Sequence, residues 1–287
     1  METKTGTRRF NIQPKRIGVV GKFEIMSPEE PQLPPPPSAE KLNSLAREPE
    51  RIQCLALPNN RNRSRMPCAE QTARMLRQRY GDFAHYNRKN PFEELLFILC
   101  SIQTQESKYR KTYAALRRKF PRFAELAAAT PSAIAGPLKF GGLSKTKSKL
   151  IARMCRLIVA RFGKLSLAPL ATMSDADCER LLTSLPGVGL KVARCVMMYS
   201  LDRQVFPVDT HCWRICRRLG WVRGNRDGVC TKSDMNRLQD KIPAQWRHSL
   251  HVNMVSLGRE FCVSGSPRCE PCPLKPVCRM AQTKRSS

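Results

Sequence analysis

Four cysteines near the C-terminal end constrain most strongly how this 287-residue chain can fold. They span 17 residues with the spacing C-x6-C-x2-C-x5-C, and they are Cys262, Cys269, Cys272 and Cys278. Four thiolates this close in sequence can converge on one metal centre, because the loops between them are short and cost little entropy to close. The sequence therefore predicts a metal site made by cysteine sulfurs alone.

The spacing favours a [4Fe–4S] cluster over zinc. A zinc ribbon usually contains two C-x2-C pairs, whereas this run has one pair, unequal outer gaps and four prolines that stiffen the loop. Soft thiolates without a neighbouring histidine also argue against a hydrolytic zinc. Four incidental thiols or two disulfides are the alternatives.

The other nine cysteines are scattered, several of them in apolar runs such as LLFILC and CVMMY. We expect buried free thiols, which indicate a reducing compartment. The sequence contains no run of about 18 apolar residues and no apolar segment of a secretion signal. We therefore expect an intracellular protein with no membrane partner, in the cytoplasm or nucleoid of a bacterium, or in the nucleus or mitochondrion of a eukaryote.

The chain carries 51 Lys+Arg against 23 Asp+Glu, a net charge of +28. Such an excess is typical of proteins that bind a polyanion. Residues 1–65 hold 12 basic and 7 acidic side chains, which leaves 39 and 16, or +23, on residues 66–287. A basic face on the folded part is therefore a better candidate for a nucleic-acid surface than a basic tail.

Residues 1–65 also contain nine of the 22 prolines and little apolar periodicity. Such a segment cannot bury enough apolar surface to offset the entropy of ordering, so we expect a disordered tail. It is either a regulatory or targeting arm or an over-extended start before Met66. A protein beginning at Met66 should keep its activity and most of its nucleic-acid affinity, with a steep dependence on salt.

From Cys68 onward, apolar residues recur at steps of three and four and are interrupted by Pro, Gly and Asp/Ser. This periodicity predicts helices almost throughout, and Ser174-x-x-Asp177 is a typical helix start. No run alternates as a strand would, so we expect an all-α fold of two helical lobes that share a cleft. The expected helices are 69–80, 91–103, 107–119, 122–128, 131–136, 145–162, 175–184, 190–201, 209–219, 232–241 and 246–257.

Two of these helices flank the short segment Leu185-Pro-Gly-Val-Gly189. Its glycines let the backbone come close to a neighbour, and the following helix presents unpaired N–H groups at its positive end. Such a turn can hold a DNA phosphate without reading sequence, although a tight connector between helices is the simpler alternative.

Lys191 lies in the first turn of the following helix, and Asp209 lies eighteen residues further on in the segment VDTH. We expect the helix N-terminus and partial burial to lower the pKa of Lys191, so that a neutral amine can attack a sugar C1′ and form a Schiff base. Asp209, close to a helix N-cap, could stabilise oxocarbenium charge or orient a nucleophile. The alternatives are a phosphate contact for Lys191 and an ordinary cap for Asp209.

LPGVGLK, VDTH and the four cysteines, in this order and spacing, closely resemble the endonuclease III family of helix-hairpin-helix DNA glycosylases. The resemblance covers roughly residues 69–280 and includes NPFEELL at 90–96, SIQTQ at 101–105 and GLSKTK at 142–147. It implies that Lys191 is the Schiff-base nucleophile and Asp209 the catalytic carboxylate. The hairpin departs from the family's pattern at Leu190, where a cation is common.

The resemblance also implies which residues contact DNA. Gln103 would fill the gap left by a flipped base, and Leu143 would wedge into the opposite strand, because an empty position in the base stack is costly. The full expected set is Gln103, Leu143, Ser144, Gly187, Val188, Gly189 and His211. The implied domains are a six-helix barrel at 88–197, which contains the hairpin, and an iron–sulfur domain at 66–87 and 198–280, whose cluster is structural and whose basic loop can face DNA.

The function implied by the resemblance is base excision repair by a monomeric enzyme. We predict a DNA glycosylase with apurinic/apyrimidinic (AP) lyase activity, which removes oxidised pyrimidines from duplex DNA and binds double-stranded DNA with a damaged base or AP site. QTQ at 103–105 also resembles adenine-mismatch glycosylases, and FPVDT at 206–210 resembles the Demeter-type 5-methylcytosine glycosylases. A mismatch, alkylated-base or 5-methylcytosine glycosylase is therefore an alternative, and a non-enzymatic iron–sulfur DNA-binding protein is another.

Overall fold

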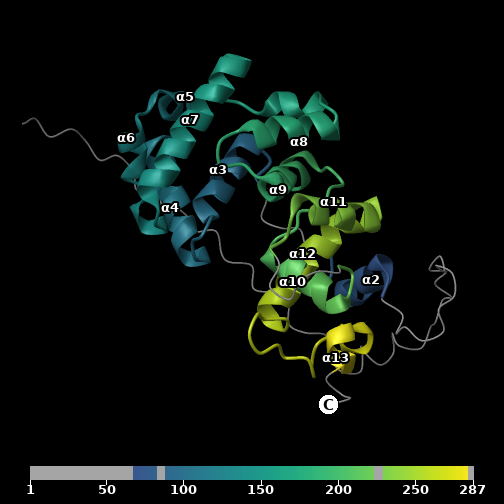
Figure 1. Cartoon of the computed structure of the whole chain (residues 1–287). Coiled ribbons are helices and arrows are strands. Elements are labelled where there is room, and N and C mark those ends of the chain that lie inside the picture. The colour runs from purple at the N-terminus through teal and green to yellow at the C-terminus, as the bar shows by residue number, and fades with distance from the viewer. Residues whose placement is uncertain (1–66, 83–87, 223–228, 284–287) are drawn as a thin grey trace, which may run out of the picture. The chain divides into compact units, whose positions relative to one another are not determined.

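The computed structural model describes residues 67–82, 88–222 and 229–283. Within these ranges the chain is helical and contains no strand (Figure 1), which confirms the all-α prediction. The tail expected at residues 1–65 lies outside the described residues. The helices are α2 (Ala69–Tyr80), α3 (Pro91–Ser101), α4 (Glu106–Lys119), α5 (Phe123–Ala128), α6 (Pro131–Ala135), α7 (Ser144–Phe162), α8 (Asp175–Ser184), α9 (Leu190–Leu201), α10 (Thr210–Leu219), α11 (Lys232–Lys241), α12 (Ala244–Glu260) and α13 (Arg279–Thr283), with short 3-10 helices η2 (Lys139–Gly141), η3 (Ala168–Thr172) and η4 (Lys275–Val277).

Sequence periodicity located α2 to α12 to within a few residues but did not identify α13 or the 3-10 helices, and local capping explains several helix starts. The Asn90 side chain accepts hydrogen bonds from the amides of Phe92 (3.0 Å) and Glu93 (3.2 Å) at the start of α3. Ser174 caps α8 as predicted, by accepting the Asp177 amide at 3.1 Å. The expected end of α3 at residue 103 is wrong: the helix stops at Ser101, because Gln103 has a left-handed backbone with φ of 50°.

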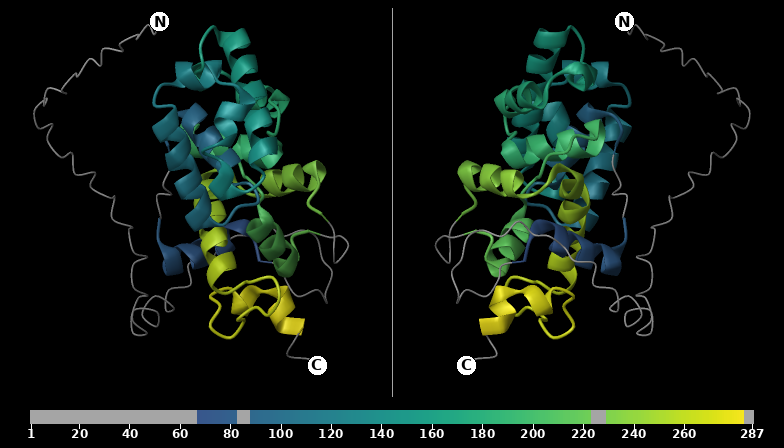
Figure 2. Two further views of the ribbon diagram at one scale, coloured as in Figure 1. Left: turned by 90° about the vertical axis from the view of Figure 1, so that its left-hand side faces the viewer. Right: turned by 90° about the vertical axis from the view of Figure 1, so that its right-hand side faces the viewer.

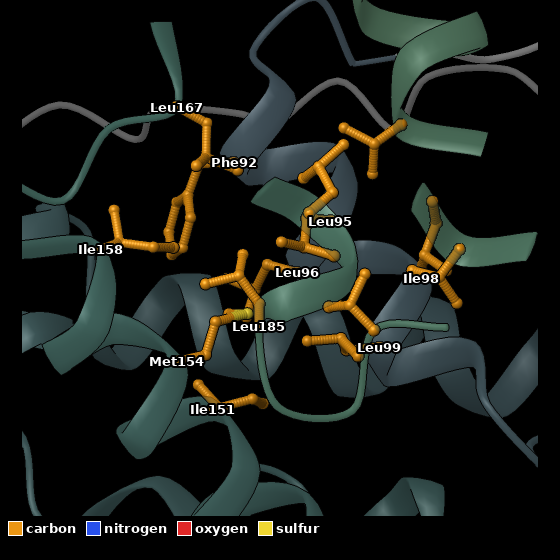
Figure 3. Packing of buried hydrophobic residues seen from close by; sticks show 14 of the residues in the cluster. Phe92, Leu95, Leu96, Ile98, Leu99, Ile151, Met154, Ile158, Leu167 and Leu185 are labelled. Carbon is orange, nitrogen blue, oxygen red and sulfur yellow. The ribbon is translucent and has the colours of Figure 1, made fainter. Parts of the chain in front are cut away.

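Helices α3 to α9 enclose a first hydrophobic core, which runs from Phe92 to Val205 along the chain. Figure 3 shows its centre, where side chains of α3 meet those of α7 and of the segments that lead into α8 and α9. The labelled members include Phe92, Leu96, Met154 and Leu185, all of them buried. Buried side chains of α8 and α9 belong to this core, which therefore holds in place the helical hairpin that these two helices form.

A second hydrophobic core is built from α2 and from the chain after Val205. Here α12 packs against both α2 and α10, and Figure 2 shows α2 (blue) beside α12 (yellow-green). Its central side chains include Leu76, Phe206, Ile215 and Met254, each at most 1% exposed. The domains expected at 88–197 and at 66–87 with 198–280 remain a prediction. The buried residues change from the first core to the second between Val205 and Phe206, close to the expected boundary.

Arg194 joins helices that belong to different cores. Its guanidinium is 2% exposed and donates to Glu179 of α8 (2.8 Å), to the Met235 carbonyl (3.2 Å) and to Asn236 of α11 (2.5 Å). A buried cation of this kind is stabilised because each of its three guanidinium nitrogens donates to an acceptor. The hairpin helices α8 and α9 are thereby held against α11.

Six of the eight described cysteines outside the C-terminal group are buried as expected, whereas Cys68 and Cys230 are only partly buried. Cys100, Cys155, Cys178, Cys195, Cys212 and Cys216 are buried free thiols. Among the described residues, no helix is both long enough and apolar enough to cross a membrane.

Candidate functional site

The turn between α8 and α9 presents its glycine backbone to solvent. Gly187 has a φ of 78°, and a Cβ there would lie 3.3 Å from Leu150 Cδ1, so both conformation and space favour glycine. Gly189 has no atom within 4 Å of its would-be Cβ, and both glycines are exposed. Val188 is buried and anchors the turn to the first core.

Helix α9 begins directly after this turn and has no side-chain cap. Its first amides therefore face an open, glycine-lined surface at the positive end of a 12-residue helix. Backbone N–H groups in this arrangement can bind a phosphate or another anion. The structure thus shows the local geometry that the sequence predicted for the segment from Gly187 to Gly189.

Lys191 and Asp209 lie at the starts of two different helices, and their charges interact. Lys191 is half-buried in the first turn of α9, and Asp209 is the N-cap of α10, where its Oδ1 accepts the Cys212 amide at 2.7 Å. Each of the two charged groups shifts the pKa of the other toward the charged form. Because the cap bond fixes the Asp209 side chain, its carboxylate has one defined orientation.

The predicted lowering of the Lys191 pKa is wrong. The pKa of Lys191 is raised above its ordinary value, because the Cys195 sulfur, one turn further along α9, and the Asp209 carboxylate favour the ammonium and outweigh burial. Burial raises the pKa of Cys195 itself, and the charge of Lys191 acts against that shift. The sequence argument considered the helix terminus and burial and left out Cys195 on the same helix, while Asp209 reaches Lys191 only through the fold.

Two buried residues near this pair were not identified from the sequence. His251 of α12 is 2% exposed, and its Nδ1 lies 2.8 Å from the Pro207 carbonyl and 3.4 Å from Cys212 Sγ. Burial raises the pKa of Asp209, but His251, the Cys212 amide and Lys191 lower it by more, so the group is a carboxylate. Glu94 is 2% exposed, and burial raises its pKa although the charge of Lys191 acts against the shift. A single histidine or glutamate within a helix does not indicate, from the sequence alone, that it lies close enough to Lys191 or Asp209 to interact with its charge.

Gln103 and Leu143 share an unusual backbone conformation. They have φ values of 50° and 51°, and only one other non-glycine residue among those described, Asp202, has positive φ. Leu143 is 53% exposed and forms the N-cap of α7, while Ser144, partly buried, is its first residue. Left-handed non-glycine residues are strained and persist only where surrounding contacts hold them.

A buried lysine binds residues that lie close in sequence to both positions. Lys147 Nζ donates to the Cys100 carbonyl (3.0 Å), Thr104 Oγ1 (2.8 Å) and the Gly141 carbonyl (3.3 Å). Thr104 Oγ1 in turn donates to the Gly141 carbonyl at 2.7 Å. Burial lowers the pKa of Lys147. The lysine therefore joins the segment that contains Gln103 to the segment that contains Leu143, a role the sequence did not reveal.

His211 lies in the interface between α10 and α12. Its Nδ1 is 2.9 Å from the Arg214 guanidinium, and a Cβ added to Gly258 would lie 2.5 Å from the same nitrogen. Burial lowers the pKa of His211, with Asp209 acting in the opposite direction. The imidazole is therefore packed against α12, and its expected DNA contact stays a prediction.

The four C-terminal cysteines are free and partly exposed. In the part of the chain described, no three His, Cys, Asp or Glu side chains are close enough to hold a metal ion as they stand. The sulfurs are nevertheless neighbours: burial first, and then the charges of the other three cysteines, raise the pKa of Cys272 to about 11. Backbone amides at Leu274, Met280 and Ala281 act against these shifts and lower the pKa values of Cys272 and Cys278.

This donor set fits an iron–sulfur cluster. The Arg218 guanidinium donates to Cys262 Sγ at 3.0 Å, and with the backbone amides it would stabilise thiolate charge. Two cations of the loop have local partners, since Arg268 bonds the Glu260 carbonyl and Lys275 pairs with Glu270. Arg279, the third cation expected to face DNA, is exposed.

Comparison with known proteins agrees with this geometry. The HhH-GPD superfamily of base excision DNA repair proteins matches residues 97–241. Endonuclease III of Thermotoga maritima is 30% identical over 209 residues, which cover 73% of this chain and 91% of that protein. A putative DNA glycosylase of Arabidopsis thaliana is 32% identical over 165 residues; these cover 58% of this chain and only 55% of the Arabidopsis protein.

A solved structure of a trapped endonuclease III–DNA covalent intermediate shares the fold. Its TM-score is 0.61 and its sequence identity 26%, and the match covers 76% of this chain and 95% of the other. Fold, sequence and the arrangement of the hairpin thus agree with one another. The chain belongs to the HhH-GPD superfamily of base excision DNA repair proteins and is a DNA glycosylase similar to endonuclease III.

Proposed function

We propose that this enzyme is a bifunctional glycosylase and AP lyase that removes oxidised pyrimidines from duplex DNA through a Schiff base at Lys191. The observation that carries the proposal is the pairing of Lys191 with Asp209 beside the open start of α9. A lysine used only as a phosphate contact would have no need of a partly buried carboxylate fixed by a helix cap. The covalent endonuclease III–DNA intermediate in a structurally similar protein supports the same chemistry.

The protonation states suggest how the first step proceeds. The Lys191 ammonium transfers a proton to the departing base, its nitrogen forms a bond to C1′, and the bond from C1′ to the base breaks, so total charge is conserved. The Asp209 carboxylate stabilises the positive charge that develops on the sugar. A proton then moves from the nitrogen to O4′ as the ring opens, which gives the protonated Schiff base. Removal of a C2′ proton from that intermediate expels the 3′ phosphate.

The α8–α9 turn would hold the DNA backbone during this step. The exposed amides at the start of α9 suit a phosphate, and the Gly189 surface is open to its approach. Gln103 would fill the gap that the everted nucleotide leaves in the base stack, and Leu143 would wedge into the opposite strand. Their strained backbones are consistent with such roles. Duplex DNA with a damaged base or AP site is the proposed partner of a monomeric enzyme.

Gly189→Ala should weaken DNA binding and leave the fold intact. The added methyl group meets no protein atom within 4 Å, but it occupies the surface where a phosphate would lie. Loss of one charge-assisted contact predicts roughly tenfold weaker binding to a fluorescein-labelled duplex, measured by anisotropy. Gly136→Ala is the matched control, because that glycine is also exposed and its nearest contact would be Lys119 Nζ at 3.8 Å. Equal affinity of the two variants would argue against a phosphate at this turn.

The proposed cofactor is a [4Fe–4S] cluster held by Cys262, Cys269, Cys272 and Cys278. When bound, it would hold the C-terminal loop in shape, and no step of the reaction depends on it. Protein purified without oxygen should be yellow-brown and contain about four irons per chain, by the stoichiometry of the cluster. Cys272→Ser should lose most of that iron, whereas Cys230→Ser, outside the group, should retain it. Stoichiometric zinc in a colourless protein would overturn the assignment.

The substrate is tested with a panel of duplexes that each carry one modified or mismatched base. Single-turnover release should be fastest for oxidised or ring-saturated pyrimidines, and sodium borohydride should trap a covalent adduct during the reaction. Release confined to a mismatch, an alkylated base or 5-methylcytosine would replace the proposed substrate with that class. DNA binding without release of any base would indicate a non-enzymatic DNA-binding protein.

A further inference from the structure

Large apolar side chains are concentrated on one exposed edge of the structure. In the described ranges, five large hydrophobic residues are exposed: Ile102, Phe140, Leu143, Leu157 and Val229. Three of them, Ile102, Phe140 and Leu143, lie in the two segments that flank Lys147's hydrogen-bond partners. Phe140 is the largest side chain in this group and is 66% exposed.

The two segments are held together below these side chains. Lys147 and Thr104 both bond the Gly141 carbonyl, which directly follows Phe140, and Lys147 also bonds the Cys100 carbonyl two residues before Ile102. Ile102, Phe140 and Leu143 are therefore presented by one hydrogen-bonded unit, which we call the apolar tip.

Phe140 is held in place by its backbone although its ring is exposed. It is the central residue of η2, and a Cβ on the adjacent Gly141 would lie 2.8 Å from Thr112 Oγ1 of α4. The turn therefore sits directly on α4 and has little freedom to fold the ring inward. An aromatic ring on a fixed backbone has few torsions left to order on binding, which favours contact with a flat apolar partner.

The charge around the tip identifies the kind of partner. Residues 139–149 contain four lysines and no acidic residue, and three of these lysines, Lys139, Lys145 and Lys149, are exposed. Lys108 and Lys111 are exposed on α4. An apolar tip bordered by cations is complementary to a polyanion that also offers flat apolar faces, as the bases of nucleic acid do.

We propose that Phe140 is a further DNA-contacting residue, which stacks on a nucleobase beside the position that Leu143 would wedge apart. This inference rests on the proposed function, since it uses the same opened duplex. Opening the stack leaves the faces of neighbouring bases uncovered, and an aromatic ring covers such a face better than an aliphatic side chain. Phe140 would thus stabilise the opened duplex and have no part in the bond-breaking chemistry.

The direct probe is Phe140→Trp, with a duplex that contains a tetrahydrofuran AP-site analogue. Stacking on a base should quench the emission of the new tryptophan on binding, measured as the difference from wild type, which has three native tryptophans. Leu157→Trp is the matched control, because Leu157 is 43% exposed and lies outside the apolar tip. Its emission should be unchanged when the same duplex binds.

Phe140→Ala measures the contribution to affinity. Loss of one aromatic stacking contact predicts roughly tenfold weaker binding to the tetrahydrofuran duplex by anisotropy, with Leu157→Ala binding as wild type does. Borohydride trapping on a preformed single-stranded AP site should be unaffected, because no paired strand has to be opened. Because the Phe140 ring is exposed, a tryptophan should be accommodated there without disturbing the fold. Phe140→Trp therefore still tests the contact if Phe140→Ala unfolds.

The outcomes separate this inference from the proposed function. If the wild type forms the borohydride adduct but Phe140→Trp shows no quenching and Phe140→Ala binds normally, the Phe140 contact is refuted alone. If the wild type neither binds the duplex nor forms an adduct, the proposed function fails first. A response of Phe140→Trp to vesicles of phosphatidylserine and phosphatidylcholine, without one to DNA, would replace the nucleobase with an anionic lipid surface.

Discussion

Lys191→Gln should abolish the adduct that borohydride traps between the enzyme and AP-site DNA. Glutamine has nearly the same length, but its amide nitrogen cannot attack C1′ or form an imine. Removing a catalytic nucleophile lowers turnover by roughly three orders of magnitude or more, so base release should be undetectable in a normal assay. The measurement is the fraction of labelled DNA that becomes covalently attached on a denaturing gel.

The control for Lys191→Gln is Lys164→Gln. Lys164 is exposed just beyond the end of α7 and away from the apolar tip, so its replacement removes the same net charge without removing the proposed nucleophile. Its adduct should equal that of the wild type. Because Lys191 is half-buried and faces Asp209, the circular dichroism and melting temperature of Lys191→Gln must also be compared with wild type. A folded Lys191→Gln protein with an undiminished adduct would show that another amine is the nucleophile.

Local sequence rules located the helices well, and the reason is that they depend on neighbours in the chain. Asn90 and Ser174 have the side chains that cap a helix, and the apolar periodicity of α7 or α12 marks a face that must be buried. The fold class follows from the same local signals. The positions of Lys191 and Asp209 at two helix starts were readable for this reason.

The details of the site depend on contacts between distant segments, and the sequence did not reveal them. The raised pKa of Lys191 comes from Cys195 and Asp209, and the second of these reaches it only through the fold. The left-handed backbones of Gln103 and Leu143 are stabilised by Lys147, which lies 44 residues from the first of them. A residue pattern cannot distinguish that buried lysine from its exposed neighbour Lys149.

Gly258→Ala should destabilise the packing of α12 against α10 and displace the start of α10, which includes Asp209. The new Cβ would lie 2.5 Å from His211 Nδ1 and 2.7 Å from His211 Cβ, distances that real contacts essentially never show. The Arg214 guanidinium also donates to the Gly258 carbonyl at 3.0 Å, so the interface has little freedom to adjust. Overpacking of this severity predicts a loss of about 3 kcal/mol in the free energy of unfolding.

A second substitution tests whether the clash with His211 is the cause. Thermal unfolding of Gly258→Ala should begin roughly 6 to 12 °C lower than wild type, the shift expected from that loss in a chain of this size. His211→Gly removes both the ring and the Cβ that the new methyl group would meet, so the double variant should recover part of the lost melting temperature. This coupling, measured as a double-mutant cycle, should be about 1 to 3 kcal/mol. Additive effects of the two substitutions would show that Gly258 is needed for another reason than the close approach of His211 to α12.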